Sequence, residues 1–405
     1  MIVMSYLDGW TPEVLSRRAE RIREYLTERE LEALAVMDNL NFTYVTGFFL
    51  DTAPWERPVV AVIPADGEPF MVLCELSANH VRFALEEGRG WIRDVRFYVE
   101  HPRQVNRLYT VREWSILVSE VFREKGITKG RVGVDSNPLA LERRLKPHLP
   151  DLSFVDASRL LREMRLIKCE EELDLIRKGG ELSDWGQVRF KEAIEVGKPW
   201  IALGAEVAHL LAMEAARRYP NYSIRASAGG TGLGPFSAMP HGPGGFSGRE
   251  IQRGDVIVNG VGVRLNMYGV ENERTFFVGE PTEKQRRVFE VMREAQERAL
   301  EMCVEGNKVS DIDAAAQEVI EKAGYGDYIM HRTGHGIGLG GHEYWDDIAF
   351  NHRTLKAGMV TSVEPGIYIY GEFGVRHSDT VIVGRKKPEV VTRYSKELEG
   401  LIVKV

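Results

Sequence analysis

A glutamate pair in the segment YGVENERTFFV is the first candidate for chemistry, because strand geometry would place both carboxylates side by side. Residues two apart in an extended strand lie on the same face. If this segment is a strand, Glu271, Glu273 and Thr275 point one way. Asn272 and Arg274 then point the other way. The carboxylates either form an ordinary solvated face or hold a cation, and the strand alone leaves both interpretations open.

The segment HRTGHGIGLGGHEYWDD contains two histidines seven residues apart, His335 and His342. It is also rich in glycine, which costs conformational entropy in regular structure. So many glycines around two imidazoles favour a backbone that is shaped around a ligand. We therefore predict that both histidines belong to a binding site.

Ionisable residues interrupt two apolar segments near the C-terminus. Glu364 follows the apolar run VTSV and stands directly before a proline. The segment GVRHSDTVIVG contains Arg376, His377 and Asp379. An ionisable group inside a buried strand must be paired or have a function. The pattern predicts a functional role for Glu364.

The glycine-rich stretch SAGGTGLGPFSAMPHGPGGFSG could be a phosphate-binding loop, so its spacing was compared with the known loop patterns. It has no Gly-x-x-x-x-Gly-Lys pattern and no Gly-x-Gly-x-x-Gly that follows a strand and opens a helix. A nucleotide site is therefore not expected. The glycines favour a backbone that passes close to a ligand, with His241 at its centre.

Two domains must position these residues. The first part alternates helical and β-rich segments and predicts a small α/β domain over residues 1–158. A long helical stretch begins the second part, residues 159–405, where strands precede and follow two further helices. Strands and helices segregated in this way predict an α+β domain with an antiparallel sheet covered by helices.

Composition narrows the class of protein. The 405 residues are 43% hydrophobic and 28% charged, with a formal net charge of -7, which is typical of a globular protein and disfavours nucleic acid as a partner. No apolar run is long enough to span a membrane, and the N-terminus lacks a signal-peptide pattern. We expect a cytoplasmic protein without membrane contact. The three cysteines lie far apart and form neither a disulfide framework nor a zinc spacing.

The chain resembles the creatinase, Xaa-Pro aminopeptidase (prolidase) and methionine aminopeptidase superfamily. The resemblance is carried by NFTYVTGF, MPHGPGGFSGREIQRGD, RTFFVGEPTEKQ, GHGIGLGGHE, SVEPGIY and GVRHSDT, in this order along the chain. It implies a catalytic domain with the pita-bread fold, preceded by a smaller creatinase-type N-terminal α/β domain.

The peptidases of this superfamily bind two metal ions with two aspartates, one histidine and two glutamates. His335 matches the histidine and Glu364 the first glutamate. The other three positions differ: Gly260 or Asn259 for the first aspartate, Glu271 for the second and Ser378 for the last glutamate. Too few carboxylates remain to hold two divalent cations. One zinc, iron or manganese ion is still possible, with ligands from His335, Glu271, Glu364 and His377.

The resemblance to creatinase implies a mechanism without metal, and this is our leading hypothesis from the sequence. It describes a metal-independent hydrolase, with no cofactor, that cleaves a C–N bond of a small cationic non-peptide substrate. Histidine exchanges protons near neutral pH, and paired carboxylates hold a cation. The expected catalytic residues are His241, Glu273, His335 and Glu364, and the expected substrate-binding residues are Glu271, His342, Arg376, His377, Trp55 and Arg57.

The resemblance also implies a homodimer in which an N-terminal loop reaches the neighbouring active site. In this chain the loop is FFLDTAPWERP. Trp55 would stack on a cation and Arg57 would bind a carboxylate. Ordinary surface residues between two strands would produce the same sequence, so both interpretations stay open.

Three alternatives compete with the creatinase-like hydrolase. The first is an Xaa-Pro-type peptidase with an altered, mononuclear metal site. The second is a lyase acting on a small onium acid, and the third is a non-catalytic relative that binds peptides. Retention of His241, His335, His342 and Glu364 together argues against simple loss of catalysis.

Overall fold

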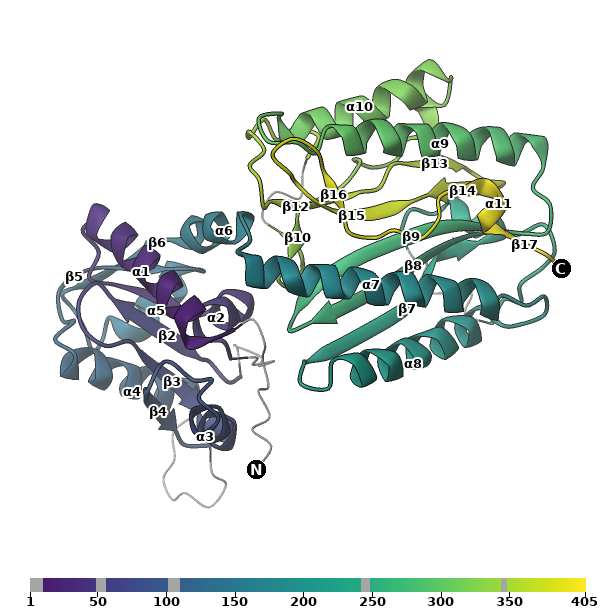
Figure 1. Ribbon diagram of the computed structural model, residues 1–405. Helices are drawn as coiled ribbons and strands as arrows, with labels where there is room; N and C mark the ends of the chain where they lie inside the picture. Colours follow the sequence, from purple (N-terminus) through teal and green to yellow (C-terminus); the bar gives the residue numbers. More distant parts are fainter. Residues whose placement is uncertain (1–9, 49–55, 101–109, 242–247, 344–347) are drawn as a thin grey trace. The chain divides into compact units, whose positions relative to one another are not determined.

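A computed structural model describes residues 10–48, 56–100, 110–241, 248–343 and 348–405 (Figure 1). The chain divides into two compact units, Met1–Met164 and Arg165–Val405. The domain boundary predicted after residue 158 falls at the first residue of a helix, Ser158–Leu166. The prediction that independently folding domains meet after residue 158 stays a prediction. Within the described ranges, no helix is long and apolar enough to cross a membrane.

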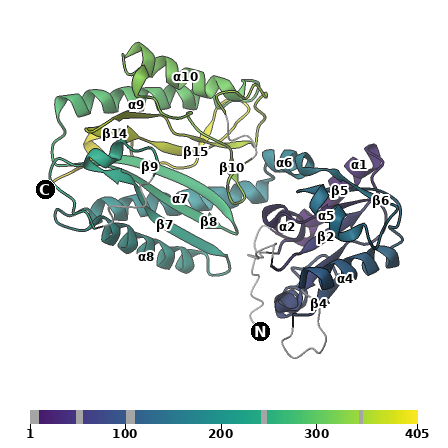
Figure 2. The same cartoon turned by 180° about the vertical axis from the view of Figure 1, so that it is seen from behind.

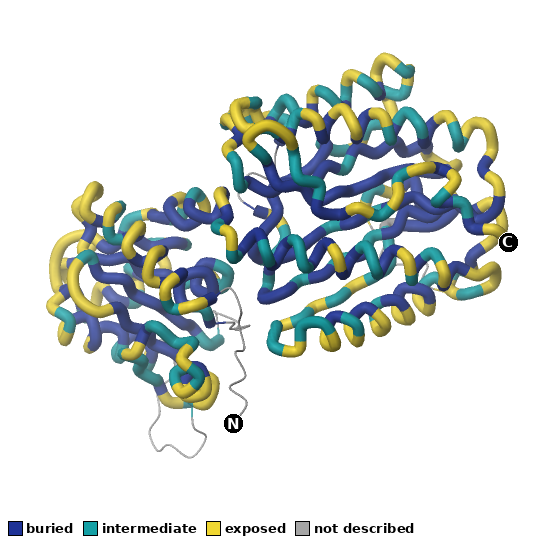
Figure 3. The backbone as a smooth tube through the Cα atoms, in the orientation of Figure 1, coloured by how far each residue is buried: buried dark blue, intermediate teal, exposed yellow. Residues whose placement is uncertain are grey.

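The first unit is built on a six-stranded mixed sheet with the order β4-β3-β2-β1-β5-β6. Its strands are mostly apolar and buried because helices pack against the sheet (Figure 3). The strands are β1 (Ala33–Val36), β2 (Val60–Pro64), β3 (Phe70–Cys74), β4 (Asp94–Tyr98), β5 (Gly130–Val134) and β6 (Leu152–Asp156). The helices are α1 (Pro12–Glu28), α2 (Asn39–Thr46), α3 (Ala78–Glu86), α4 (Thr110–Glu124), α5 (Pro138–Leu145) and α6 (Ser158–Leu166), with a 3-10 turn, η1 (Glu75–Ser77).

The second unit contains a seven-stranded sheet in which β12, β15, β9, β8 and β7 follow one another and β16 and β17 pair with β15 and β9. All its strand pairs are antiparallel except β17 with β9. The strands are β7 (Ile224–Leu233), β8 (Val256–Leu265), β9 (Tyr268–Val278), β12 (Val360–Val363), β15 (Ser378–Ile382), β16 (Glu389–Val390) and β17 (Ile402–Val403). Two separate ribbons pair β10 (Ile337–Gly338) with β11 (Gly341–His342) and β13 (Gly366–Ile369) with β14 (Phe373–Arg376).

Helices cover this sheet on its outer side. In both views, α7 and α8 lie along β7, β8 and β9, and α9 and α10 lie along the C-terminal strands (Figures 1 and 2). The helices are α7 (Glu170–Ala193), α8 (Trp200–Arg218), α9 (Glu283–Glu301), α10 (Val309–Lys322) and α11 (Leu398–Leu401), with 3-10 turns η2 (Gly234–Ala238) and η3 (Gly326–Tyr328). The predicted fold class, a pita-bread α+β domain preceded by an α/β domain, is confirmed.

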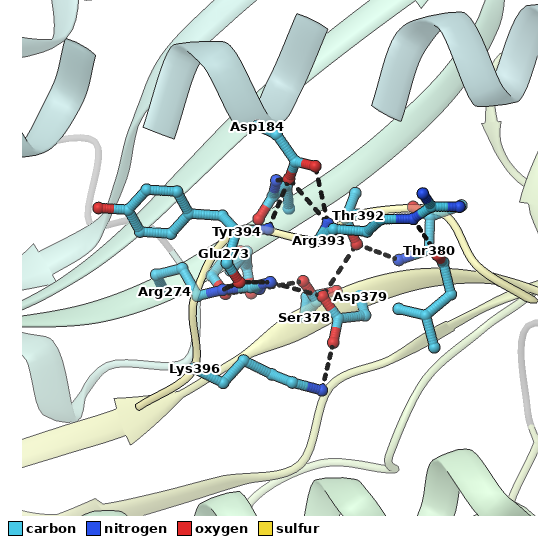
Figure 4. A network of polar contacts seen from close by, with 12 residues as sticks. Asp184, Glu273, Arg274, Ser378, Asp379, Thr380, Thr392, Arg393, Tyr394 and Lys396 are labelled. Atoms are coloured by element: carbon cyan, nitrogen blue, oxygen red, sulfur yellow. Dashed lines mark hydrogen bonds and ion pairs between the residues drawn. The ribbon is translucent and has the colours of Figure 1, made fainter. Parts of the chain in front are cut away.

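A buried ion pair ties β9 to β15 on the helix-covered side (Figure 4). Arg274 Nη2 lies 2.8 Å from Asp379 Oδ1, and both side chains are fully inaccessible to solvent. Lys396 Nζ lies 3.1 Å from the other Asp379 oxygen. Arg274 also donates to the carbonyl oxygens of Ser378 and Tyr394. Every charge in this group therefore has an opposite charge beside it.

Candidate active site

Strand alternation in β9 sorts its polar residues onto two faces. Glu273 pairs with Gly260 on β8 and with Ser378 on β15, so these three residues share one face. Glu271 lies on the same face, and both glutamates line one cavity. Asn272 points to the other face, where its amide donates to Asp184 Oδ1 on α7.

This cavity has a volume of about 220 Å³. It gathers residues that are far apart in the sequence, from strands of the main sheet and from the glycine-rich segments. Its lining residues are Pro240, His241, Glu271, Glu273, His331, Arg332, His335, His342, Glu364 and Arg376. Seven of the residues predicted as site residues therefore meet here: His241, Glu271, Glu273, His335, His342, Glu364 and Arg376.

His335 stands at the centre of the acidic part of the cavity. Its backbone is anchored to β12, because Ser362 N donates to its carbonyl and its own N–H donates to Ser362 Oγ at 3.0 Å. Its Nδ1 donates to the Gly336 carbonyl at 3.0 Å. Nε2 therefore faces two carboxylates, with Glu271 Oε2 at 3.3 Å and Glu364 Oε1 at 3.5 Å. A neutral imidazole would aim a lone pair at two anions, so this arrangement requires a proton or a metal cation.

The pKa values of these three residues follow from their mutual contacts. Burial, and after it the charge of Glu271, raise the pKa of Glu364 to about 8. Burial opposes a charged His335, but the hydrogen bond and charge of Glu271 outweigh it and raise the pKa of His335 to about 9. Burial alone would raise the pKa of Glu271, whereas the His335 contact brings it below its ordinary value. Opposed shifts of this kind are typical of functional sites.

His342 joins this group through a tight ribbon. Leu339 and Gly340 join β10 to β11, and the φ angles of Gly340 (+85°) and of Gly341 (+101°), the first residue of β11, favour glycine. The turn brings the two imidazoles together, with ring centroids 3.5 Å apart and an interplanar angle of 17°. One ligand atom each from Glu271, His335 and His342 lies within 4.8 Å of the others. These residues could hold one metal ion.

Glu273 occupies the space in front of Gly260. A Cβ atom on Gly260 would lie 3.3 Å from Glu273 Oε1. The Glu273 carboxylate is held by Arg376, with Nε at 2.5 Å and Nη2 at 2.8 Å from its two oxygens. Nη2 donates a hydrogen bond to one carboxylate oxygen, and Nε forms a close ion-pair contact with the other. Glu273 is therefore fixed beside the acidic group, with its charge already offset.

Tyr368 and His331, which the sequence analysis did not identify, extend this set of contacts beyond Arg376. Arg376 Nη1 donates to the Tyr368 hydroxyl at 3.3 Å, and that hydroxyl lies 2.7 Å from His331 Nε2. His331 Nδ1 lies 2.6 Å from the Arg332 carbonyl, so Nε2 accepts the proton of Tyr368. Burial lowers the pKa of His331 to about 4, which keeps it neutral. The motif HRTGHG places His331 four residues before His335, but only the folded structure shows that it lines the cavity.

Two predicted substrate-binding residues, His377 and Arg57, have their contacts elsewhere among the described residues. His377 lies between Arg376 and Ser378, so alternation turns it to the opposite face, where it is fully buried against Phe289 on α9, with ring centroids 5.2 Å apart. The prediction that it contacts substrate or metal is therefore wrong. Arg57 is paired within the first unit, with two hydrogen bonds of 2.9 Å to Glu100. Trp55 lies outside the described residues, and the predicted homodimer stays a prediction.

The fold and the acidic, imidazole-rich cavity define a hydrolase of the metallopeptidase class. Two family models match the chain. Metallopeptidase family M24 matches residues 174–385, and the Creatinase/Prolidase N-terminal domain matches residues 18–167. The chain belongs to metallopeptidase family M24, and the resemblance found in the sequence is confirmed.

Similar proteins agree with this assignment. The Xaa-Pro dipeptidase of Pyrococcus furiosus is 38% identical over 95% of this chain and 100% of its own length. The Xaa-Pro dipeptidase of Lactobacillus delbrueckii subsp. lactis is 31% identical over 95% of this chain and 99% of its own. The structure of the prolidase from Pyrococcus horikoshii superimposes with a TM-score of 0.76 at 27% identity, covering 94% of this chain and 99% of that one. The structure of dipeptidase PepE from Mycobacterium ulcerans superimposes with a TM-score of 0.78 at 28% identity. The match covers 97% of this chain and 99% of that one.

These matches overturn the leading hypothesis from the sequence. A metal-independent hydrolase of a small cationic non-peptide substrate is wrong, because the family is one of metallopeptidases and the similar proteins are Xaa-Pro dipeptidases. The error came from counting carboxylates only at the family's ligand positions. The structure adds His342 to the acidic group and brings Glu273 in front of Gly260.

Proposed function

We propose that this protein is a metal-dependent dipeptidase that hydrolyses the amide bond of an Xaa-Pro dipeptide. The observation that carries the proposal is the group formed by Glu271, His335 and His342, whose ligand atoms lie within 4.8 Å of one another in a cavity of about 220 Å³. A cavity of this size suits a small substrate. The names of the similar proteins supply the substrate class.

One divalent ion fits this group. Glu271, His335 and His342 offer one carboxylate and two imidazoles, a set that suits zinc, iron or manganese. The Nε2 atom of His335 already faces the carboxylates because its Nδ1 proton is committed to Gly336. When bound, the ion would polarise the substrate carbonyl and make water more acidic.

A second ion does not fit in the same way. The family positions at Gly260 and Ser378 offer no carboxylate. The carboxylate that lies against Gly260 is that of Glu273, and both its oxygens face Arg376. A metal there would have to displace a buried guanidinium. The site is therefore mononuclear.

Proton transfer falls to Glu364. Its carboxyl group lies beside His335 and receives a 3.3 Å hydrogen bond from Ser362 Oγ. A carboxyl group with a raised pKa can accept a proton from water and return it to the leaving nitrogen near neutral pH. His241 stands at the exposed rim of the cavity, where it can contact the substrate. Arg376 donates a hydrogen bond to Glu273 and another to the Tyr368 hydroxyl, and these contacts fix the position of Glu273.

The test is hydrolysis of glycyl-proline by protein stripped with a chelator and then loaded with manganese, cobalt or zinc. We expect cleavage that depends on the added ion and stops when the chelator returns. No cleavage with any of the three ions, or cleavage that persists in the chelator, would contradict the proposal.

A further inference from the structure

A buried ion pair lies next to the ribbon of β10 and β11, which carries His342. Arg165, near the C-terminal end of α6, and Glu343, the residue after His342, approach each other with 2.9 Å between Nη2 and Oε2. Their side chains are 7% and 1% exposed, and both residues belong to the second unit. A buried ion pair adds little net stability, because desolvation offsets the attraction of the charges. Its contribution must therefore lie in the groups that it holds in place.

The pair binds the turn between β10 and β11 through both backbone groups of Leu339. Glu343 Oε1 accepts the Leu339 N–H at 3.0 Å, and Arg165 Nη2 donates to the Leu339 carbonyl at 3.2 Å. On the side of the β8–β9 hairpin, the Gly340 N–H donates to the Met267 carbonyl at 2.9 Å. The turn is therefore fixed from two sides, although it belongs to a ribbon of only two short strands.

Glu343 is also connected to both imidazoles of the candidate metal site. It follows His342 directly in the chain, and its own N–H donates to the Gly336 carbonyl at 2.8 Å. The same carbonyl accepts the Nδ1 proton of His335 at 3.0 Å. A displacement of Glu343 would therefore move His342 and shift the acceptor that fixes the tautomer of His335.

The charges around Glu343 balance one another without a metal ion. Arg165 and Lys168 supply two cations, and Glu343 and Glu172 supply two anions. Burial lowers the pKa of Lys168, and the charges of Glu343 and Glu172 oppose that shift. Gly338 leaves space for the group, because a Cβ atom there would overlap Glu343 Oε1 and lie 2.9 Å from Lys168 Cε. In this respect the group differs from the acidic cavity, where a ligand cation can bind.

We infer that Arg165 and Glu343 are positioning residues, which hold the imidazoles of His335 and His342 in the arrangement that binds the metal ion. The inference rests on the proposed function, because that function places the ion between these ligands. Neither positioning residue lines the cavity, so both act through the two histidines. Loss of a group that orients metal ligands typically weakens metal binding by about ten- to a hundredfold.

The test titrates the metal-stripped full chain with cobalt and records its visible absorption, because cobalt bands report the number and geometry of the ligands. In Arg165→Met we expect the cobalt affinity to fall at least about tenfold and the bands to shift from those of the wild-type protein. Arg165→Lys keeps a cation opposite Glu343 and should recover part of the affinity.

A double variant, Arg165→Met with Glu343→Leu, separates positioning from stability. It removes both buried charges, so it should fold even if Arg165→Met does not. Its cobalt affinity should still be at least about tenfold below that of the wild-type protein, because the side-chain hydrogen bonds to Leu339 are lost.

Arg274→Met is the matched control, because Arg274 and Asp379 form a fully buried pair on the helix-covered face of β9. It should lower stability and leave the cobalt affinity and bands unchanged. Wild-type affinity and bands in the double variant would overturn the inference. An equal loss of affinity in Arg274→Met, or no cobalt binding by the wild-type protein, would overturn it as well. Cobalt binding that depends on Arg165, without cleavage of glycyl-proline, would contradict the proposed function alone.

Discussion

The two faces of β9 place ionisable residues at alternate positions in opposite environments. On the helix-covered face, Arg274, Asp379 and Lys396 form a closed set in which each charge meets an opposite charge (Figure 4). On the cavity face, Glu271 and Glu364 both lie within 3.5 Å of His335, which is charged only when protonated, whereas the guanidinium of Arg376 is paired with Glu273. The charges on the helix-covered face are therefore fully paired. On the cavity face, burial and the charge of Glu271 raise the pKa of Glu364, and the hydrogen bond and charge of Glu271 raise the pKa of His335.

This difference distinguishes structural from functional charge. A buried pair holds two strands together and costs stability when one partner is lost. A group of carboxylates without a paired cation is less stable than such a pair, but it provides a site where a ligand cation can bind. Alternation within one strand is enough to separate the two roles.

The largest expected effect comes from His335→Ala on the cavity face. The change removes the imidazole between Glu271 and Glu364 and should lower the rate of Xaa-Pro hydrolysis at least about a thousandfold, with loss of bound metal. Rate assays and elemental analysis measure both. The control is His352→Ala, which removes an exposed imidazole that contacts Ser310 and should leave both unchanged. Retention of metal and rate in His335→Ala would remove this residue from the site.

Glu364→Gln should separate proton transfer from metal binding. The amide keeps the shape of the side chain but cannot accept a proton, so we expect kcat to fall about a hundred- to a thousandfold. The metal content should stay unchanged, because the proposed ligands are intact. Steady-state kinetics with glycyl-proline provide the measurement. A variant that lost its metal together with its activity would show that Glu364 is a ligand.

Substitutions on the helix-covered face of β9 should change the stability of the fold and leave the catalytic site unchanged. Arg274→Met leaves Asp379 buried without its closest cation and should lower the free energy of unfolding by about 3 to 5 kcal/mol. Replacing both residues, Arg274→Met with Asp379→Leu, should recover part of that loss. Urea unfolding followed by circular dichroism measures the change. Loss of bound metal from the folded variant would break the distinction between the faces.

The smallest expected effect is the pH dependence of stability in the metal-free protein. The folded pKa of Glu364, about 8, and that of His335, about 9, both lie above their ordinary values. Each group therefore stabilises the fold at low pH and loses that contribution as the pH rises through its folded pKa. The melting temperature should fall between about pH 6 and pH 9.5, less steeply in Glu364→Gln. Unchanged melting across this range would mean that the acidic group is not coupled to His335.

Much of this arrangement was predictable from local sequence patterns. Period-two alternation in YGVENERTFFV predicted that Glu271 and Glu273 share a face, and the structure places both in the cavity. The glycines between His335 and His342 predicted a shaped backbone, and they form the turn that stacks the two rings. The two-layer fold class followed from segregated helices and strands together with the resemblance.

Long-range pairing was not predictable in the same way. The contact of Arg376 with Glu273 depends on the register between β15 and β9, which no local pattern fixes. Tyr368 enters through the pairing of β13 with β14, and His331 reaches its hydroxyl from a segment outside the strands. The error at His377 was avoidable, because alternation within GVRHSD already turns it away from Arg376. The prediction that the protein works without metal was wrong because it compared only the family's ligand positions. It did not consider which carboxylates and imidazoles the fold brings together.

We expect one divalent ion, held by Glu271, His335 and His342, to support peptide hydrolysis. The most direct test is a stepwise titration of chelator-stripped protein with manganese or cobalt, in which bound metal and the rate of glycyl-proline cleavage are measured in the same samples. We expect the rate to rise from near zero and to reach its maximum at one ion per chain. Full activity without metal, or a rate that rises only as a second ion binds, would contradict this expectation.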